Sequence, residues 1–394
     1  MGMINLLFVF AGMAAGILTG LMPGLHVNTI SLLLLAMNPE PSIDIALFII
    51  SMAVMHSFTD FIPSILLGAA DETSFLSVLP GHRLLLKGKG LHAINMTIYG
   101  SFFGGIISII LIPFFGLFML QFDALLELLL PLLLMLVLAM MVLSEERKLR
   151  ALIIVITAGA IGFISLKTSL NALNPIFVIV TGFFGLATII NSIKSNEAIP
   201  LQETKERKLG MATLKASFLS SIAGSITAII PGLGPSQSAF ITRKLVGRIK
   251  TKDYLALLGG LNTCNLVFSI ALLYFAGKTR IGAAAAIKQL MDLSFQDFLL
   301  IITVIIFSLG FSALIAKKIA FIACKKINSI EYKKLNLLVL ACVIVISFFL
   351  TNLTGLLLLA TTTAIGLATI KSGIRRSNLM AFLMVPALLY YLGL

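Results

Sequence analysis

Apolar runs of about 20 residues recur along this chain, and each is long enough to cross the hydrocarbon core of a bilayer. Hydrophobic residues make up 59% of the chain and charged residues 11%, against roughly 45–50% and about 25% in soluble domains. Only helices and closed barrels satisfy their backbone in lipid, and the alternating pattern of barrel strands is absent. The sequence therefore predicts an all-α polytopic protein of the plasma membrane.

We expect about ten full spans, five on each side of a polar linker. The first five cover Ile45–Leu67, His92–Met119, Ala124–Leu143, Ala151–Leu166 and Asn174–Ile193. The second five cover Leu255–Ala276, Phe298–Ala316, Leu335–Leu350, Gly355–Ile370 and Asn378–Leu392.

Two further apolar segments, Asn5–Met37 and Leu214–Arg243, are each interrupted by a Pro-Gly pair. Proline ends the preceding helix, and glycine permits unusual backbone angles. The stretches "GILTGLMPGLHVNTIS" and "GSITAIIPGLGPSQSA" match in register, and a long apolar helix with a polar interruption follows each. We therefore expect an internal repeat, with residues 1–193 as the first copy, 194–212 as a cytoplasmic linker and 213–394 as the second copy.

Lysine and arginine gather in short clusters between the apolar runs, as the positive-inside rule predicts. The net charge of +13 is therefore topological, and we expect no nucleic-acid partner. We place the basic segments Pro80–Gly90, Glu145–Arg150, the central linker, Arg243–Asp253 and Lys317–Lys334 in the cytoplasm. Asn38–Asp44 and Gln121–Asp123 carry no lysine or arginine and face outward, and we place Lys278–Lys288 outside although it is basic.

This loop pattern gives the two repeats opposite orientations, so that each Pro-Gly segment is a helical hairpin with its tip in the membrane. Inverted repeats with broken helices are a recurrent design of secondary transporters. The half-helix after each tip would present its positive end to an anion. The candidate substrate-binding residues are Gly24, Leu25, His26, Asn28, Thr29, Gly232, Gly234, Ser236 and Gln237. The alternative is a pair of kinks packed by neighbouring helices.

Asp60 is the one clear carboxylate within a predicted span, where a charge is costly and marks a functional candidate. His56 lies four residues earlier on the same helix face, so the two side chains could pair. The candidate coupling-ion residues are His56, Asp60, Asn262 and Asn265. The alternative is a buried polar pair that only tightens packing.

Three glycines spaced by four residues, Gly12, Gly16 and Gly20, precede the first tip, and this spacing favours close helix packing. No metalloprotease, P-loop or nucleophile-elbow motif occurs in the sequence. The three cysteines have neither paired nor metal-like spacing. We expect no enzymatic activity, no metal site and no cofactor other than Na⁺ as a coupling ion.

At these residues the chain resembles the permease subunit of the tripartite tricarboxylate transporters, the TctA family, as a short and divergent member. The resemblance rests on "GILTGLMPGL", "PGHRLLLKGKG" and "AGSITAIIPGLGPSQSAF". It implies carboxylate uptake driven by a Na⁺ or H⁺ gradient, with a small membrane subunit and an extracytoplasmic binding protein as partners.

We therefore predict a secondary active transporter that couples a cation to uptake of a small organic anion, such as a di- or tricarboxylate, by alternating access. One alternative substrate is a phosphate-bearing or polyprenyl-phosphate lipid anion, because helix N-termini bind phosphate equally well. The alternative from a different class is an intramembrane enzyme.

Overall fold

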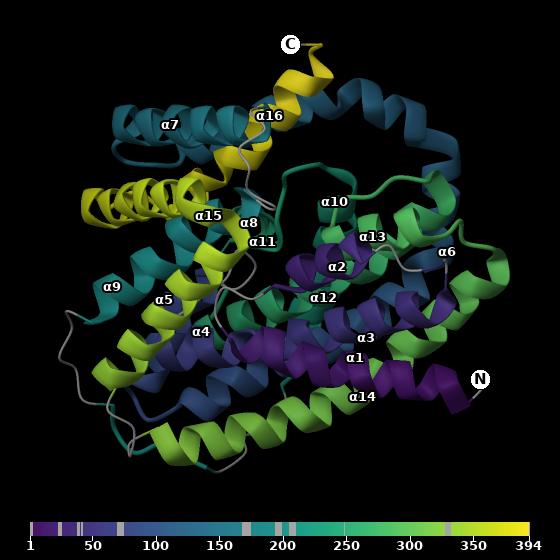
Figure 1. Ribbon diagram of the computed structural model, residues 1–394, viewed down its shortest axis with the longest axis horizontal. Coiled ribbons are helices and arrows are strands. Elements are labelled where there is room, and N and C mark those ends of the chain that lie inside the picture. The colour runs from purple at the N-terminus through teal and green to yellow at the C-terminus, as the bar shows by residue number, and fades with distance from the viewer. Residues whose placement is uncertain are drawn as a thin grey trace.

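The computed structural model describes residues 3–22, 26–37, 40, 42–68, 75–167, 175–193, 199–204, 210–247, 249–327 and 332–393. Its regular structure over these ranges is entirely helical (Figure 1). Seven of the described helical segments are long and apolar enough to cross a membrane. The prediction of an all-α polytopic membrane protein is confirmed, although fewer full spans are described than the ten expected.

The first half of the chain runs through α1 (Met3–Leu21), α2 (Val27–Ala36), α3 (Ile43–Thr59), α4 (Phe61–Leu67), α5 (Phe75–Leu85), α6 (Gly90–Leu143), α7 (Lys148–Lys167), α8 (Pro175–Val180), the π-helical turn η1 (Thr181–Leu186) and α9 (Ala187–Ile193). The second half runs through α10 (Met211–Ile229), α11 (Pro235–Val246), α12 (Thr251–Ala276), α13 (Gly282–Leu290), α14 (Phe295–Lys326), α15 (Tyr332–Ser372), the 3₁₀ turn η3 (Arg376–Met380) and α16 (Ala381–Tyr391).

One continuous helix of 54 residues, α6, replaces two expected spans and the loop expected between them. Gln121–Asp123 lies inside this helix, so its assignment as an outward loop was wrong. Two polar residues, Gln121 and Asp123, without a glycine or proline beside them do not stop a helix when strong helix formers follow. The prolines within α6, Pro113 and Pro131, remove backbone donors and favour bends, and Figure 1 shows the helix changing direction along its length.

Two short helices lie in segments that we expected to be loops. These are α5, which follows the first buried span, and α13, which begins within Lys278–Lys288 and ends at Leu290. Both are too short to give a hydropathy signal, and the basic residues around them suggested loops. The break expected between Leu335–Leu350 and Gly355–Ile370 does occur. It lies at Asn352 inside α15, whose φ of 56° and ψ of −164° are not helical.

The second Pro-Gly segment breaks as the sequence predicted, with α10 ending at Ile229 and α11 beginning at Pro235. Gly232 in this turn has φ 74°, a left-handed conformation that glycine adopts without strain. The first segment is likewise split between α1 and α2. Pro23, Gly24 and Leu25 lie outside the described residues.

The glycine row of α1 packs directly on α3, which confirms its structural interpretation. A Cβ at Gly12 would overlap the backbone of Phe48, and one at Gly20 would overlap the side chain of Thr59. Gly16 is similarly close to the backbone of α3. These small residues let the two helices approach closely where lipid supplies no hydrophobic drive for their association.

The order of elements runs in parallel in the two halves. Each begins with a broken pair (α1 and α2, or α10 and α11) and continues with a largely buried helical segment (α3 with α4, or α12). A short helix (α5 or α13) and a long helix (α6 or α14) follow. This order agrees with the proposed repeat, whose opposite orientation in the membrane stays a prediction.

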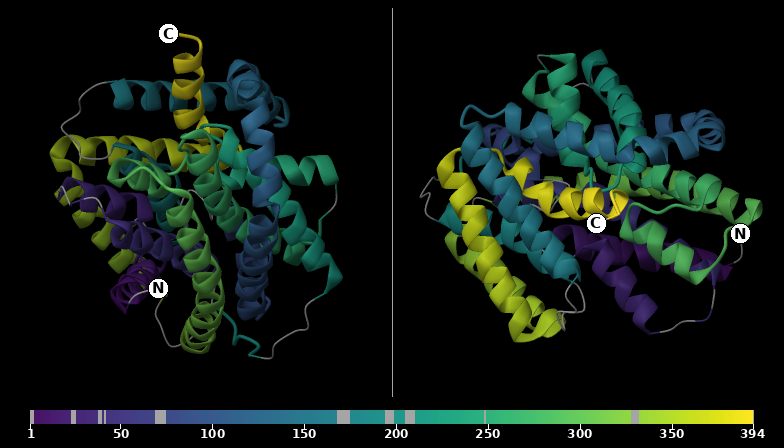
Figure 2. Two further views of the ribbon diagram at one scale, coloured as in Figure 1. Left: turned by 90° about the vertical axis from the view of Figure 1, so that its right-hand side faces the viewer. Right: turned by 90° about the horizontal axis from the view of Figure 1, so that it is seen from above.

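The hydrophobic cores do not divide at the central linker that separates the two halves of the sequence. The largest hydrophobic core joins α1 to α6 with α10 to α14, and we call this set the first helix group. Two smaller cores join α7, α8 and η1 with α15, η3 and α16, and this set, with α9, is the second helix group. Figures 1 and 2 show the second group gathered beside the first, with late yellow helices against earlier teal ones. Each group therefore mixes residues from both halves of the chain.

Candidate functional site

A cavity of about 550 Å³ lies between the two helix groups. Its polar wall comes from α2, α3, α12 and α13, and from the segments that lead into α11 and α13. Its apolar wall includes Leu166, Ile176, Leu383 and Pro386 of the second group. The size is within the range of small-molecule sites, and such sites commonly combine an apolar lining with a few placed polar groups.

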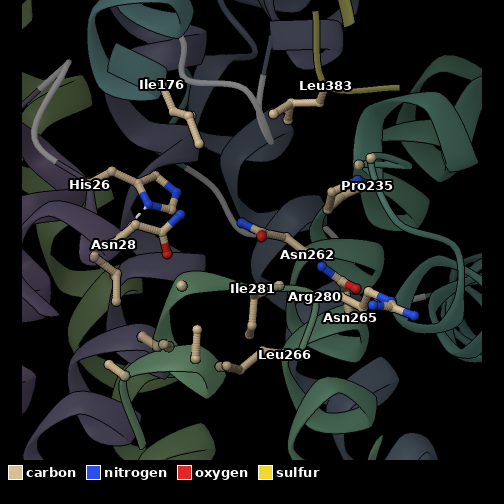
Figure 3. Close-up of a pocket in the computed structure, with 18 of the residues that line it drawn as sticks. His26, Asn28, Ile176, Pro235, Asn262, Asn265, Leu266, Arg280, Ile281 and Leu383 are labelled. Carbon is tan, nitrogen blue, oxygen red and sulfur yellow. Dashed lines mark hydrogen bonds between the residues drawn. The ribbon is translucent and has the colours of Figure 1, made fainter. Parts of the chain in front are cut away.

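The structure brings residues from both predicted constellations to this one cavity. The lining includes His26, Asn28, His56, Gly232, Gly234, Asn262 and Asn265. Figure 3 shows His26 and Asn28 on one side, with Asn262, Asn265 and Arg280 on the other. The two tips thus share a space although they are far apart in the sequence.

The other predicted residues do not line the cavity or cannot be placed. Ser236 and Gln237 are completely buried in the first turn of α11, and Asp60 is buried at the start of α4. None of these three is part of the lining. Gly24, Leu25 and the side chain of Thr29 lie outside the part of the chain that the structure describes.

Three helix N-termini reach the cavity. Helix α2 begins there after His26, α11 after Gly234 and α13 after Ile281. The His26 side chain caps α2, because its Nδ1 accepts a hydrogen bond of 3.2 Å from the backbone N–H of Asn28. Gly234 and Ile281 supply no side-chain cap. The uncapped N–H groups and aligned peptide dipoles of α11 and α13 therefore give the wall a positive potential.

Arg280 is the residue that the sequence interpretation missed. It lines the cavity, and its Nε donates a hydrogen bond of 3.1 Å to the carbonyl oxygen of Ile229, the last residue of α10. Its position was hidden because the basic segment Lys278–Lys288 was assigned as a plain outer loop. A basic segment on the side where the positive-inside rule disfavours it is the signal that could have marked it.

The loop that carries Arg280 is fixed to α6 by its neighbour Lys278. Lys278 Nζ lies 2.5 Å from Asp123 Oδ2 and 2.8 Å from Glu127 Oε1. These carboxylates offset the charge of Lys278, whereas none of the described residues that line the cavity is acidic. The cavity itself is therefore electrostatically suited to an anion.

The two histidines of the cavity contact each other. The ring centroids of His26 and His56 are 4.8 Å apart with an interplanar angle of 67°. His56 Nδ1 lies 3.1 Å from Thr19 Oγ1, while its Nε2 is buried and has no hydrogen-bond partner among the described residues. Asn265 Oδ1 is likewise buried without a hydrogen-bond partner among the described residues. Buried polar atoms are nearly always paired, so open groups beside a cavity indicate a place for a ligand or water.

Asp60 lies behind the cavity wall. Its Oδ2 accepts a hydrogen bond of 3.0 Å from Asn262 Nδ2, and Asn262 itself lines the cavity. The sequence suggested that Asp60 could pair with His56; the structure shows the bond from Asn262 to Asp60 and places Thr19 Oγ1 beside His56 Nδ1. A second bond between the same helices, 3.0 Å from Ser57 Oγ to Thr263 Oγ1, holds α3 against α12.

Within the described residues, no cluster of three or more histidine, cysteine or acidic side chains could hold a metal ion. The site therefore offers positive potential, amide groups and two imidazoles around one cavity. Chemically, this set is suited to binding an anion and exchanging a proton.

Comparisons with known proteins agree with the sequence resemblance. The family model described as "Tripartite tricarboxylate transporter TctA family" matches residues 6–381. An uncharacterized protein of Methanocaldococcus jannaschii is 31% identical over 405 residues, which covers 99% of this chain and 100% of that protein. No solved structure matches the chain.

Proposed function

The chain belongs to the tripartite tricarboxylate transporter TctA family, and we propose that it is a secondary active transporter of a small organic anion, such as a di- or tricarboxylate. Because the chain belongs to this permease family and has seven described helical segments that could cross a membrane, it is a multi-pass permease of the plasma membrane. The observation that supports an anionic substrate is the cavity, which three helix N-termini and Arg280 line and where no described lining residue is acidic.

Alternating access follows from where the cavity lies. The first helix group supplies the polar wall and the second group supplies much of the apolar wall. A rocking of one group against the other would open the cavity to one side of the membrane and close it to the opposite side, the motion used by transporters that are built from repeats. The anion would be carried without leaving its polar contacts.

The coupling cation acts at Asp60 in this mechanism. A buried carboxylate within a membrane span is costly unless a cation or proton accompanies it. Because Asn262 bonds Asp60 and also lines the cavity, a change in charge at Asp60 reaches the substrate site through one amide group. Na⁺ or H⁺ bound at Asp60 would thereby favour the arrangement that holds the anion.

Two partners follow from the family. A small membrane subunit and an extracytoplasmic binding protein would accompany the permease, and the binding protein would deliver the anion to the outward-open cavity. Co-purification of the three proteins from the native membrane tests this part of the proposal.

A phosphate-bearing lipid anion is the second candidate substrate. The apolar wall favours it, since Leu166, Ile176 and Leu383 could contact an acyl or prenyl chain while the helix N-termini hold the phosphate. The two candidates differ in the size of their apolar part, so binding measurements separate them.

The test is uptake by the purified protein in liposomes. We expect labelled citrate or succinate to accumulate when an inward Na⁺ or H⁺ gradient is imposed, and not in protein-free liposomes. A thermal-shift screen of carboxylates, inorganic phosphate and prenyl phosphates, each with and without Na⁺, identifies the ligand class first. Stabilisation by prenyl phosphates alone would favour the lipid substrate, and turnover of a substrate in detergent without any gradient would favour an enzyme.

A further inference from the structure

We infer that the cavity holds a linear dicarboxylate lengthwise, with one carboxylate at Arg280 and the second at the His26–His56 pair, and that one proton enters with it at His56. This inference rests on the proposed function and deepens it, because it names the substrate class and its two points of contact.

The first contact is at Arg280. Its Nε is bonded to Ile229 O and its Nη1 lies 3.5 Å from Thr279 O, while Nη2 has no partner among the described residues. The guanidinium is held in place because Lys278, two residues earlier, is fixed to α6 by Asp123 and Glu127. A positioned guanidinium beside uncapped helix N-termini is well suited to a carboxylate, since its planar donors match carboxylate geometry.

The second contact is on the opposite side of the cavity. Figure 3 shows His26 with Asn28 there, facing across the space toward Asn265 and Arg280. His26 Nδ1 accepts the hydrogen bond from Asn28, so in the neutral ring the proton is on Nε2 and can be donated to a ligand. One hydrogen-bond donor is therefore already available at this end.

His56 has the opposite arrangement of protons. We assign the hydroxyl proton of Thr19 to the carbonyl oxygen of Gly16, 3.2 Å away, so that Thr19 Oγ1 accepts from His56 Nδ1 at 3.1 Å. The neutral ring then has no proton on Nε2, which is buried and unpartnered among the described residues. A carboxylate cannot approach this bare nitrogen favourably unless a proton is placed between them. The dicarboxylate therefore binds with uptake of one proton from solvent, which ends on His56 Nε2.

Within the part of the chain that the structure describes, His56 has polar contacts with two side chains. His26 is the titratable side chain in ring contact with it, and α1 offers the hydroxyl of Thr19. Asp60, one turn further along, is bonded to Asn262 of α12, and Arg280 is the cation at the far side of the cavity. The proton that binds at His56 Nε2 with the dicarboxylate is therefore separate from the coupling cation proposed at Asp60.

Calorimetric titration of the purified protein with succinate and butyrate tests this inference. Both acids have four carbons, but butyrate lacks the second carboxylate. We expect the wild type to bind succinate about tenfold to a hundredfold more tightly, the effect of one charge-assisted contact. Titrations in buffers of different ionisation enthalpy should show uptake of about one proton per succinate and none per butyrate.

Single variants then assign the two ends. Arg280→Gln should weaken both acids, whereas His56→Gln should weaken succinate to the level of butyrate and abolish proton uptake. Asp60→Asn should retain the proton uptake, and His92→Gln, outside the cavity lining, should change neither acid. Thermal unfolding of each variant shows that it remains folded.

Several results would overturn the inference. These are equal affinities of the wild type for the two acids, succinate binding without a proton, or equal weakening of both acids by His56→Gln. If the wild type binds citrate but not succinate, the linear dicarboxylate is wrong while the proposed transport function stands. If it binds none of the three carboxylates, the proposed function fails as well.

Discussion

Asn262 donates a hydrogen bond from Nδ2 to Asp60 Oδ2 over 3.0 Å, and so joins two residues that are 202 positions apart in the chain. Asp60 is 2% exposed, and Asn262 is 8% exposed at the cavity. The bond therefore links the one buried carboxylate of α3 and α4 to the wall of the substrate site. It is a direct structural link between the proposed cation and the proposed anion.

Replacing this carboxylate should separate transport from its driving force. Asp60→Asn keeps an acceptor oxygen for Asn262, so the fold should persist with little change in the melting temperature. The charge that attracts the cation is lost, and uptake into liposomes should no longer respond to a Na⁺ or H⁺ gradient, although exchange of internal for external anion should continue.

A matched control for Asp60 is Asp253, a second buried aspartate at the start of α12. Its Oδ1 accepts a hydrogen bond of 3.2 Å from Thr213 Oγ1, and it does not line the cavity. Asp253→Asn should retain gradient-driven uptake. Normal gradient dependence in Asp60→Asn would show that the coupling site lies elsewhere.

The close contact between α6 and α12 should be sensitive to a single methyl group. A Cβ at Gly100 would overlap the backbone carbonyl of Ala256, which cannot move without shifting α12. Gly100→Ala should therefore lower the stability by about 1–3 kcal/mol. Gly310 on α14 has nothing within 4 Å of an added Cβ. Gly310→Ala should be neutral or stabilising by up to about 1 kcal/mol, and thermal unfolding in detergent compares the two. Equal effects would show that α6 and α12 are not packed at this position.

The opposite orientation of the repeats can be tested by labelling. Ser42→Cys lies before α3 and Lys250→Cys before α12, at equivalent points of the two halves. Cys264 and Cys324 are buried, so a Cys342→Ser background removes the more accessible native thiol. A membrane-impermeant maleimide should label residue 42 from outside and residue 250 only from inside. Labelling of both from one side would exclude the inverted repeat.

The anchor of the Arg280 loop should depend on pH and salt. Burial lowers the pKa of Lys278, but the hydrogen bonds and charges of Asp123 and Glu127 outweigh it and raise that pKa above its usual 10.5. The ion pair is therefore fully formed below pH 10.5 and is lost as the pH rises through the raised value. Because the groups are partly exposed, Lys278→Gln should cost less than about 1 kcal/mol in stability.

The clearer consequence of Lys278→Gln is local. Amide hydrogen exchange should accelerate in residues 277–281, and the affinity for anions should fall, because Arg280 is no longer held. High salt should reproduce part of the effect in the wild type. Lys371→Gln, an exposed lysine at the end of α15, is the control. Unchanged exchange in the loop would show that Arg280 is positioned without this ion pair.

Local chemistry explains what could be predicted from the sequence. Long apolar runs determined the helical membrane class, and Pro-Gly pairs determined where α10 ends and where α1 and α2 separate, because both effects act within a few residues. The polar residues next to those breaks were identifiable for the same reason. The continuity of α6 could not be predicted, because hydropathy detects the polar residues Gln121 and Asp123 but not the backbone hydrogen bonds that continue past them.

Only the tertiary structure decided which polar groups meet. Helices distant in sequence place His26 against His56 and Asn262 against Asp60, and no local pattern encodes such contacts. Arg280 shows the reason most directly. The number of basic residues in the sequence indicates only a basic loop. The tertiary structure shows that Asp123 and Glu127 of α6 pair with Lys278, while Arg280 lines the cavity. The sequence by itself determined the kind of protein and its breaks, and the packing of the helices around those breaks determined the site.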